Sequence, residues 1–120
     1  MKNIAAELKH SETAFVKKMD NKIYGLIGIC MKAGKVLSGS EQVESGIKKQ
    51  KAFLLILATD SSEKTLKRYI EAAEKYHLPY RIWGTKIELG QSLGKSIRTA
   101  VLITDKGLAS ALLKKLEPVL

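Results

Sequence analysis

The sequence holds few of the residues that build disulfides, metal clusters or membrane spans. Cys30 is the single cysteine among 120 residues, so the chain can neither close a disulfide within itself nor supply a cysteine metal cluster. It lies on the apolar side of a predicted helix and is expected to be a core residue rather than a reactive thiol. No stretch approaches the roughly 18 apolar residues that span a bilayer, and no long apolar run near the N-terminus marks a secretory signal. These absences predict a cytoplasmic protein in a reducing compartment, with no membrane partner.

Signals of catalysis are nearly absent as well. The two histidines, His10 and His77, have no other His, Cys or carboxylate at metal-ligand spacing, and there is no G-x-S-x-G elbow. The segment from Gly34 to Ser40 resembles a phosphate-binding loop, but Ser40 stands in place of its lysine and a helix rather than a strand precedes it. We therefore expect a protein that is not an enzyme, with no cofactor, no metal ion and no small-molecule substrate. An enzymatic function would need a substrate bound near His77.

Positive charge is what the sequence has in excess. Twenty-one Lys and Arg residues against twelve Asp and Glu residues give a formal net charge of +9 and a pI near 9.7. Such an excess on a small domain attracts polyanions and favours a nucleic-acid partner. The alternative is a solvated surface that happens to be cationic. The contents of 45% hydrophobic and 28% charged residues are those of an ordinary globular protein.

The chain divides into a weakly patterned start and one well-patterned domain. Residues 1–21 are expected to be an N-terminal extension, either without fixed structure or forming a short docked helix, and residues 22–120 a single domain. The domain opens with apolar residues at the spacing of an amphipathic helix: Ile23, Leu26, Ile27, Cys30 and Met31. Gly34 supplies its C-terminal stop.

The remaining pattern alternates between strands and helices. Strands are predicted at 36–37, 53–58, 80–83 and 99–103, and helices at about 40–49, 60–76, 85–93 and from 105 onward. The helix starts are assigned to polar caps: Ser38 in a capping box with Glu41, then Asp60, Thr85 and Asp105. Apolar strands alternating with helices predict an α/β protein, a three-layer α/β/α sandwich around a small mixed sheet of about four strands.

The turn at residues 38–42 is the place where chemistry is most concentrated. Gly39 lets the backbone approach a ligand, and the free N–H groups of a helix start favour phosphate. The side chains that follow on the same helix are those of Glu41, Gln42 and Ser45, with Lys48 and Lys49 beside them. The alternative is an ordinary capped surface helix with a lysine-rich tail. The two are nearly balanced, and the thin apolar stripe of this helix slightly favours the binding site, since it leaves most of the helix surface available.

Several segments in order resemble the ribosomal L7Ae superfamily of kink-turn RNA-binding proteins, and within it the bacterial YlxQ-like branch. The resemblance covers about Lys22 to the C-terminus and rests on these pieces: residues 26–28 through 33–35, Gly39-Ser40-Glu41-Gln42, residues 55–60, Leu78-Pro79-Tyr80, and the Thr85-Lys86-x-x-Leu89-Gly90-x-x-x-Gly94 pattern. It implies an α/β/α sandwich that recognises sharply bent RNA with tandem sheared G·A pairs. Reading distorted RNA is physically sensible, because the groove of a regular A-form helix is hard to read.

The resemblance also implies which residues touch RNA. Gly39 and Ser40 match the family's glycine and small hydroxyl residue, while Glu41, Gln42 and Ser45 fall at its Asn, Glu-or-Gln and Lys positions. A later loop, residues 94–99, corresponds to the one that packs on an extruded nucleotide. The full set of expected RNA-binding residues is Lys35, Gly39, Ser40, Glu41, Gln42, Ser45, Lys48, Lys49, Lys95, Ile97 and Arg98.

Two hypotheses about function follow. The first is a non-catalytic, ribosomal-protein-like RNA-binding protein whose partner is structured RNA of the kink-turn type, ribosomal RNA being one candidate. The second is a protein-interaction module of the same fold whose RNA site has diverged. Glu41 accepts but cannot donate hydrogen bonds and is repelled by phosphate, and Ser45 removes a cation from the centre of the site.

Overall fold

The computed structural model describes residues 20–117. The extension predicted over residues 1–21 lies outside the described residues except for Asp20 and Asn21, which already belong to a helix. That helix continues through residue 32, and it is followed by alternating strands and helices.

The centre of the molecule is a mixed sheet with the strand order β1-β4-β2-β3. Its strands are β1 (Val36–Leu37), β2 (Leu54–Leu57), β3 (Tyr80–Ile82) and β4 (Ala100–Ile103). β2 and β3 are parallel, whereas β4 runs antiparallel to both β1 and β2. Because Leu37 pairs with Leu102, the residues that leave β1 lie beside the residues that enter β4. This pairing positions the site described below.

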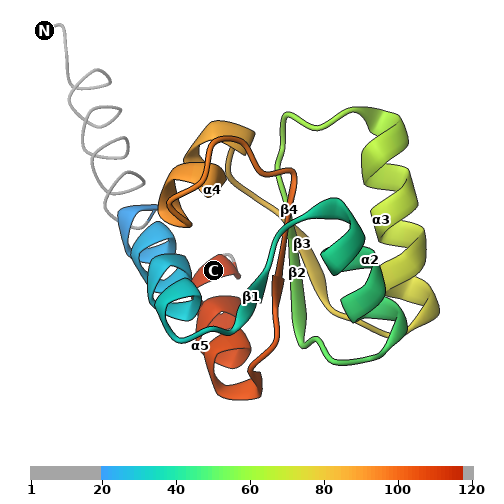
Figure 1. The fold of residues 1–120 in the computed structure, drawn as a ribbon, viewed down its shortest axis with the longest axis horizontal. Helices are drawn as coiled ribbons and strands as arrows, with labels where there is room; N and C mark the ends of the chain where they lie inside the picture. Colours follow the sequence, from blue (N-terminus) through green and yellow to red (C-terminus); the bar gives the residue numbers. More distant parts are fainter. Residues whose placement is uncertain (1–19, 118–120) are drawn as a thin grey trace, which may run out of the picture.

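Helices cover both faces of the sheet, so the predicted three-layer α/β/α sandwich is confirmed (Figure 1). The helices are residues 20–32, α2 (Ser40–Lys48), α3 (Glu63–Lys75), α4 (Lys86–Ser92) and α5 (Lys106–Leu116). The sheet face that contacts α2 and α3 is separate from the one that contacts helix 20–32, α4 and α5. Within residues 20–117, no helix is long and apolar enough to cross a bilayer.

Burial of both sheet faces explains the continuous apolar run at β2. Leu55 and Leu57 pack under α2 and α3, while Leu54 and Ile56 pack on the opposite side. All four side chains are fully buried. Phe53 was predicted inside this strand, but it precedes β2 and is 41% exposed.

Cys30 belongs to the core, as predicted. It is fully buried in the cluster formed with helix 20–32, α4 and α5. Burial raises the pKa of the Cys30 thiol, and the nearby Asp105 carboxylate raises it further. A thiol held in its neutral form is a poor nucleophile.

Two of the four predicted caps are confirmed. The Thr85 side chain accepts a hydrogen bond from the Glu88 N–H, and the Asp105 carboxylate accepts one from the Leu108 N–H. The stop at Gly34 is also confirmed, by its φ of +72°. Three other helices end with a residue at positive φ in the same way: Gln50, His77 and Gly94.

The other two caps were wrong. Gly39, not Ser38, is the N-cap of α2, and no side chain caps it. Ser62, not Asp60, caps α3 by accepting from the Thr65 N–H. The side-chain oxygens of Ser38 and Asp60 make tertiary hydrogen bonds instead. Asp60 accepts from the Lys86 N–H at 2.9 Å, which connects the segment after β2 to the start of α4, and Ser38 accepts from Arg98.

Candidate nucleic-acid interface

The start of α2 and the loop before β4 meet at one end of the sheet. Between them lies a hollow of about 260 Å³, which forms because β1 and β4 are antiparallel neighbours. It is lined by Ser38, Gly39, Ser40, Tyr69, Ile97, Arg98, Thr99 and Ala100. Two segments that sequence reasoning assigned to RNA binding separately therefore form one surface.

Arg98 is held in place at this hollow. Its Nε donates to the Ser38 hydroxyl at 3.1 Å and its Nη1 donates to the Ile97 carbonyl at 2.7 Å. Its backbone N–H also donates to the Lys86 carbonyl at 3.0 Å, on the first turn of α4. The guanidinium has five N–H donors, so most of them stay free for a phosphate or a base edge.

Ile97 presents an apolar side chain from the same loop. It is 53% exposed, so its apolar surface is available for contact. The loop is fixed on α4 because the Lys95 N–H donates to the Gly90 carbonyl at 2.8 Å and Gly94 adopts a φ of +70°. Its backbone also lies directly on Gly90, where a Cβ atom would stand 2.7 Å from the carbonyl carbon of Ser96.

The start of α2 offers backbone donors. No side chain caps this helix, so the N–H groups of its first turn are open to an anion. Gly39 has φ −75° and ψ 146°, which any residue can adopt, and a Cβ atom there would meet only the Gln42 side chain, at 3.6 Å. The fold therefore does not require glycine at this position. Ser40, Glu41 and Gln42 are exposed beside it.

Most of the remaining predicted residues lie farther from this hollow. Lys48 and Lys49 are exposed at the opposite end of α2, about 12 Å along its axis from Ser40. Ser45 is half-buried midway along the helix. Lys35 precedes β1, and its carbonyl accepts from the Thr104 N–H at the far end of β4. Lys95 is exposed on the loop itself.

Sequence reasoning missed some of the residues that line the hollow. Tyr69 of α3 is 3% exposed and forms part of its wall, together with Thr99 and Ala100 at the start of β4. Tyr69 follows Leu66 by three positions and precedes Ala73 by four, which is the spacing of one helix face, so the apolar periodicity of this helix could have identified it. Ser38 was assigned to a cap, and only the tertiary structure shows it holding Arg98.

Tyr24 packs in the layer formed by helix 20–32, α4 and α5. Its ring packs against Trp83 with a centroid separation of 4.4 Å, joining helix 20–32 to the segment before α4. Burial raises the pKa of Tyr24 to about 12, and the Glu88 carboxylate contributes to the same shift. Its hydroxyl oxygen lies 2.9 Å from the position of a Cβ atom on Gly84, which has a φ of +80°.

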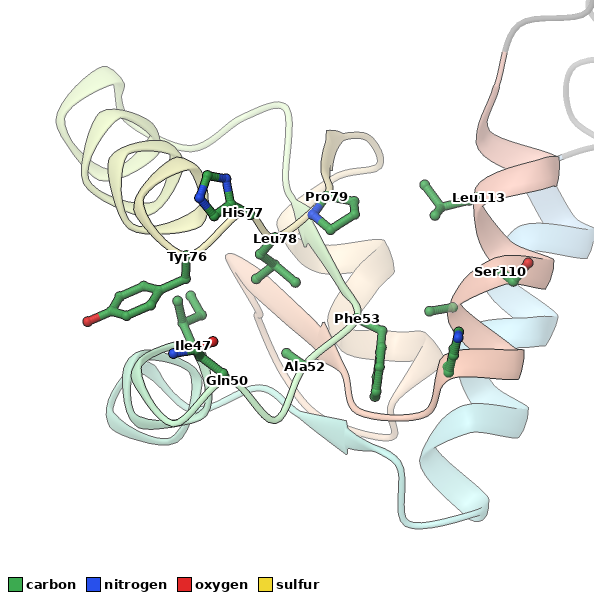
Figure 2. Close-up of a pocket in the computed structure, with 12 residues that line it drawn as sticks. Ile47, Gln50, Ala52, Phe53, Tyr76, His77, Leu78, Pro79, Ser110 and Leu113 are labelled. Carbon is green, nitrogen blue, oxygen red and sulfur yellow. The ribbon is translucent and has the colours of Figure 1, made fainter.

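A second cavity, of about 390 Å³, opens at the other end of the sheet (Figure 2). Its wall includes Phe53 before β2, Pro79 before β3 and Leu113 of α5, so it is largely apolar. The titratable residues that line it are Tyr76, His77 and Lys106. Among residues 20–117, no three His, Cys, Asp or Glu side chains group closely enough to hold a metal ion.

Comparison with known proteins gives consistent matches. The model of the "Ribosomal protein L7Ae/L30e/S12e/Gadd45 family" matches residues 21–113. The "RNA-binding protein YlxQ" of Bacillus subtilis (strain 168) is 34% identical over 94 residues, which is 78% of this chain and 94% of that protein. The protein of the same name from Enterococcus faecium is 34% identical over 88 residues, covering 73% of this chain and 84% of that protein.

Solved structures match as well. A protein with unknown function from Bacillus halodurans C superposes with a TM-score of 0.77 at 27% identity, covering 81% of this chain and 98% of that one. The Giardia lamblia 15.5kD RNA binding protein superposes with a TM-score of 0.69 at 19% identity, covering 82% of this chain and 88% of that one. At this identity the second match reflects the fold alone.

Proposed function

This chain belongs to the ribosomal protein L7Ae/L30e/S12e/Gadd45 family, in its YlxQ-like branch, and from that premise we propose that it binds structured RNA without catalysing a reaction. The observation that carries the proposal is the convergence of the uncapped start of α2 and the loop bearing Ile97 and Arg98 on one hollow. The net charge of +9 and the RNA-binding names of the relatives support it. We propose the cytoplasm as its compartment and ribosomal RNA as one candidate partner.

Each part of the surface has a distinct role in this proposal. The N–H groups of the first turn of α2 and the Arg98 guanidinium hold phosphates. The Gln42 amide both donates and accepts, so it can read a base edge, and the exposed Ile97 side chain packs against a base that has left the stack. All of these contacts need RNA whose bases are accessible, as they are at a bend or bulge.

We propose a kink-turn as the preferred target. The test compares affinity for a kink-turn RNA with affinity for the same RNA in which Watson–Crick pairs replace the G·A pairs. We expect tighter binding to the kink-turn by about tenfold or more, since the loss of one good base-edge contact is worth ~1–3 kcal/mol. Equal affinity for both RNAs would remove kink-turn specificity and leave binding to other structured RNA.

Three variants separate the roles of the residues. Gln42→Ala should reduce the preference for the kink-turn RNA, whereas Lys48→Ala should weaken both RNAs alike and flatten the salt dependence by about one unit of slope. Gly39→Ala should weaken RNA binding with a stability loss within about 1 kcal/mol, since the fold leaves room for a methyl group there. If Gln42→Ala changes nothing, the assigned reading face is wrong.

The second candidate function, a protein-interaction module, also has an observation in its favour. The largely apolar cavity around Phe53 and Pro79 lies at the end of the sheet away from the hollow, and Phe53 stays 41% exposed. Exposed apolar surface of this kind is typical of protein contacts. Co-purification of a stable protein partner with no nucleic acid, together with no measurable affinity for kink-turn RNA, would favour this candidate.

A further inference from the structure

A groove whose rim carries three cationic side chains around an apolar floor runs between α2 and α3, next to the hollow described above. It has a volume of about 320 Å³ and is lined by Glu44, Lys48, Arg68, Tyr69, Ala72, Lys75 and Tyr76. Tyr69 also lines the hollow at the start of α2, so one side chain forms the wall between the two depressions. The two depressions are therefore neighbours on the surface.

The charge of this groove comes from two helices. Lys48 lies on α2, while Arg68 and Lys75 lie about 10 Å apart along α3. The Arg68 guanidinium lies 5.1 Å from the Tyr69 ring centroid, and the Lys75 ammonium lies 5.5 Å from that of Tyr76. These cation–π contacts hold both cations along the groove while leaving them hydrated and accessible.

A single carboxylate, that of Glu44, lines the groove. Its Oε1 lies 3.5 Å from the Arg68 Nε, and the two side chains are 40% and 60% exposed. The pair is therefore a surface ion pair in contact with solvent, which contributes little to stability. A backbone phosphate can replace Glu44 as the partner of Arg68, because its two non-bridging oxygens share one negative charge and accept hydrogen bonds from a guanidinium as a carboxylate does.

We propose that this groove binds the sugar–phosphate backbone of the same RNA beyond its bent part, with Lys48, Arg68 and Lys75 as its phosphate contacts. The inference rests on the proposed RNA-binding function. It also accounts for the position of Lys48 at the far end of α2, where it is remote from the first-turn N–H groups but lies in the groove. Contacts of this kind set affinity and orientation rather than sequence preference.

The first test removes two cations from the groove and, as a matched control, two from elsewhere. Arg68→Gln combined with Lys75→Gln is compared with Lys114→Gln combined with Lys115→Gln, exposed residues of α5 on the other side of the sheet. Both double variants lower the net charge equally. We expect the groove variant to bind kink-turn RNA about tenfold or more weakly at 0.1 M salt, with the salt slope reduced by roughly 1.5, and the control to change little.

The second test is a gain of affinity. Glu44→Gln removes the carboxylate from the groove and frees Arg68, so we expect RNA binding about threefold or more tighter at 0.1 M salt. The matched control is Glu117→Gln, which also breaks an arginine ion pair, since Glu117 lies 3.6 Å from Arg81 after α5. Thermal denaturation of each variant shows that the fold is retained.

The outcomes separate this inference from the proposed function. If the wild type binds RNA and the groove variants match their α5 and Glu117 controls, the groove makes no RNA contact and the inference is overturned, although RNA binding stands. If the wild type binds no RNA at any salt concentration, the proposed function and this inference are both wrong. A protein partner lost only in the Arg68 and Lys75 variant, with RNA affinity unchanged, would also overturn it.

Discussion

Replacing Gly90 by alanine places a methyl group against the backbone of the loop that carries Ile97. An added Cβ atom would lie 2.7 Å from the carbonyl carbon of Ser96 and 3.1 Å from the Ile97 nitrogen, and closer still to the Ser96 carbonyl oxygen. Ordinary van der Waals contact begins near 3.4 Å, so the loop has to move by at least ~0.7 Å. The neighbouring atoms are backbone, and no side-chain rotation can relieve the contact.

The magnitude follows from comparison with a glycine that has free space. Gly25 lies within helix 20–32, where a Cβ atom would meet nothing within 4 Å. Alanine at either position gains roughly 0.5–1 kcal/mol from helix propensity. Gly90→Ala additionally loses about 1–3 kcal/mol to overpacking. The two variants should therefore differ by about 1–3 kcal/mol, or roughly 4–12 °C in melting temperature for a domain of this size.

Thermal denaturation followed by circular dichroism measures the difference, and RNA affinity is measured on the same samples. Gly90→Ala should melt below Gly25→Ala and should bind structured RNA several-fold more weakly at a temperature where both are folded. The physical reason is that displacement of the loop changes the positions of Ile97 and Arg98 relative to the start of α2. Equal melting temperatures for the two variants would refute the packing argument.

Two further predictions concern packing and pH. Gly46→Ala should lower the stability by about 1 kcal/mol, because the added Cβ atom would lie 2.7 Å from a methyl group of Leu102 and 2.9 Å from one of Leu37. The cost stays moderate because these side-chain ends can partly move. An unchanged melting temperature would contradict this prediction. Tyr24 has a pKa of about 12 in the folded protein, against 10 in the unfolded chain, so the folded state favours the neutral phenol. The stability that this contributes is fully present below pH 10 and is lost as the pH rises from 10 to 12. Urea denaturation at pH 9 and pH 11 should therefore show a steeper decline for wild type than for Tyr24→Phe, by about 1 kcal/mol, and parallel declines would rule out Tyr24 as the source.

The layers of the fold could be predicted because their signals are local. The stripe from Ile23 to Met31 repeats with helical spacing, and the run at β2 is long enough for a strand and too short for a helix. The positions of Ser38 and Asp60 could not be predicted in the same way. Each offers an oxygen to a nearby N–H or to a distant donor, and the distant donors, Arg98 and Lys86, are brought close only by the tertiary fold.

For the candidate site as well, the residue types could be predicted from the sequence but their arrangement in space could not. Residue types at the start of α2 and in the loop before β4 were identified from motifs, but their meeting depends on the β1–β4 pairing, which the residues alone do not specify. The distance between Ser40 and Lys48 could have been anticipated, because eight steps along a helix extend about 12 Å. The groove with Arg68 and Lys75 was not predicted, since cations on a helix surface indicate nothing until a neighbouring helix is known.

The hydrogen bond between Ser38 and Arg98 also indicates at what stage of chain synthesis the hollow at the start of α2 can form. Its partners are 60 residues apart, and β4, which seats the loop beside the end of β1, is the last strand to be synthesised. A nascent chain that has emerged only through α4 carries the α2 start but not the loop opposite it. The complete surface that we propose to bind RNA therefore forms only after β4 pairs with β1 and β2, so a chain that ends before β4 lacks the contacts of the loop that carries Ile97 and Arg98.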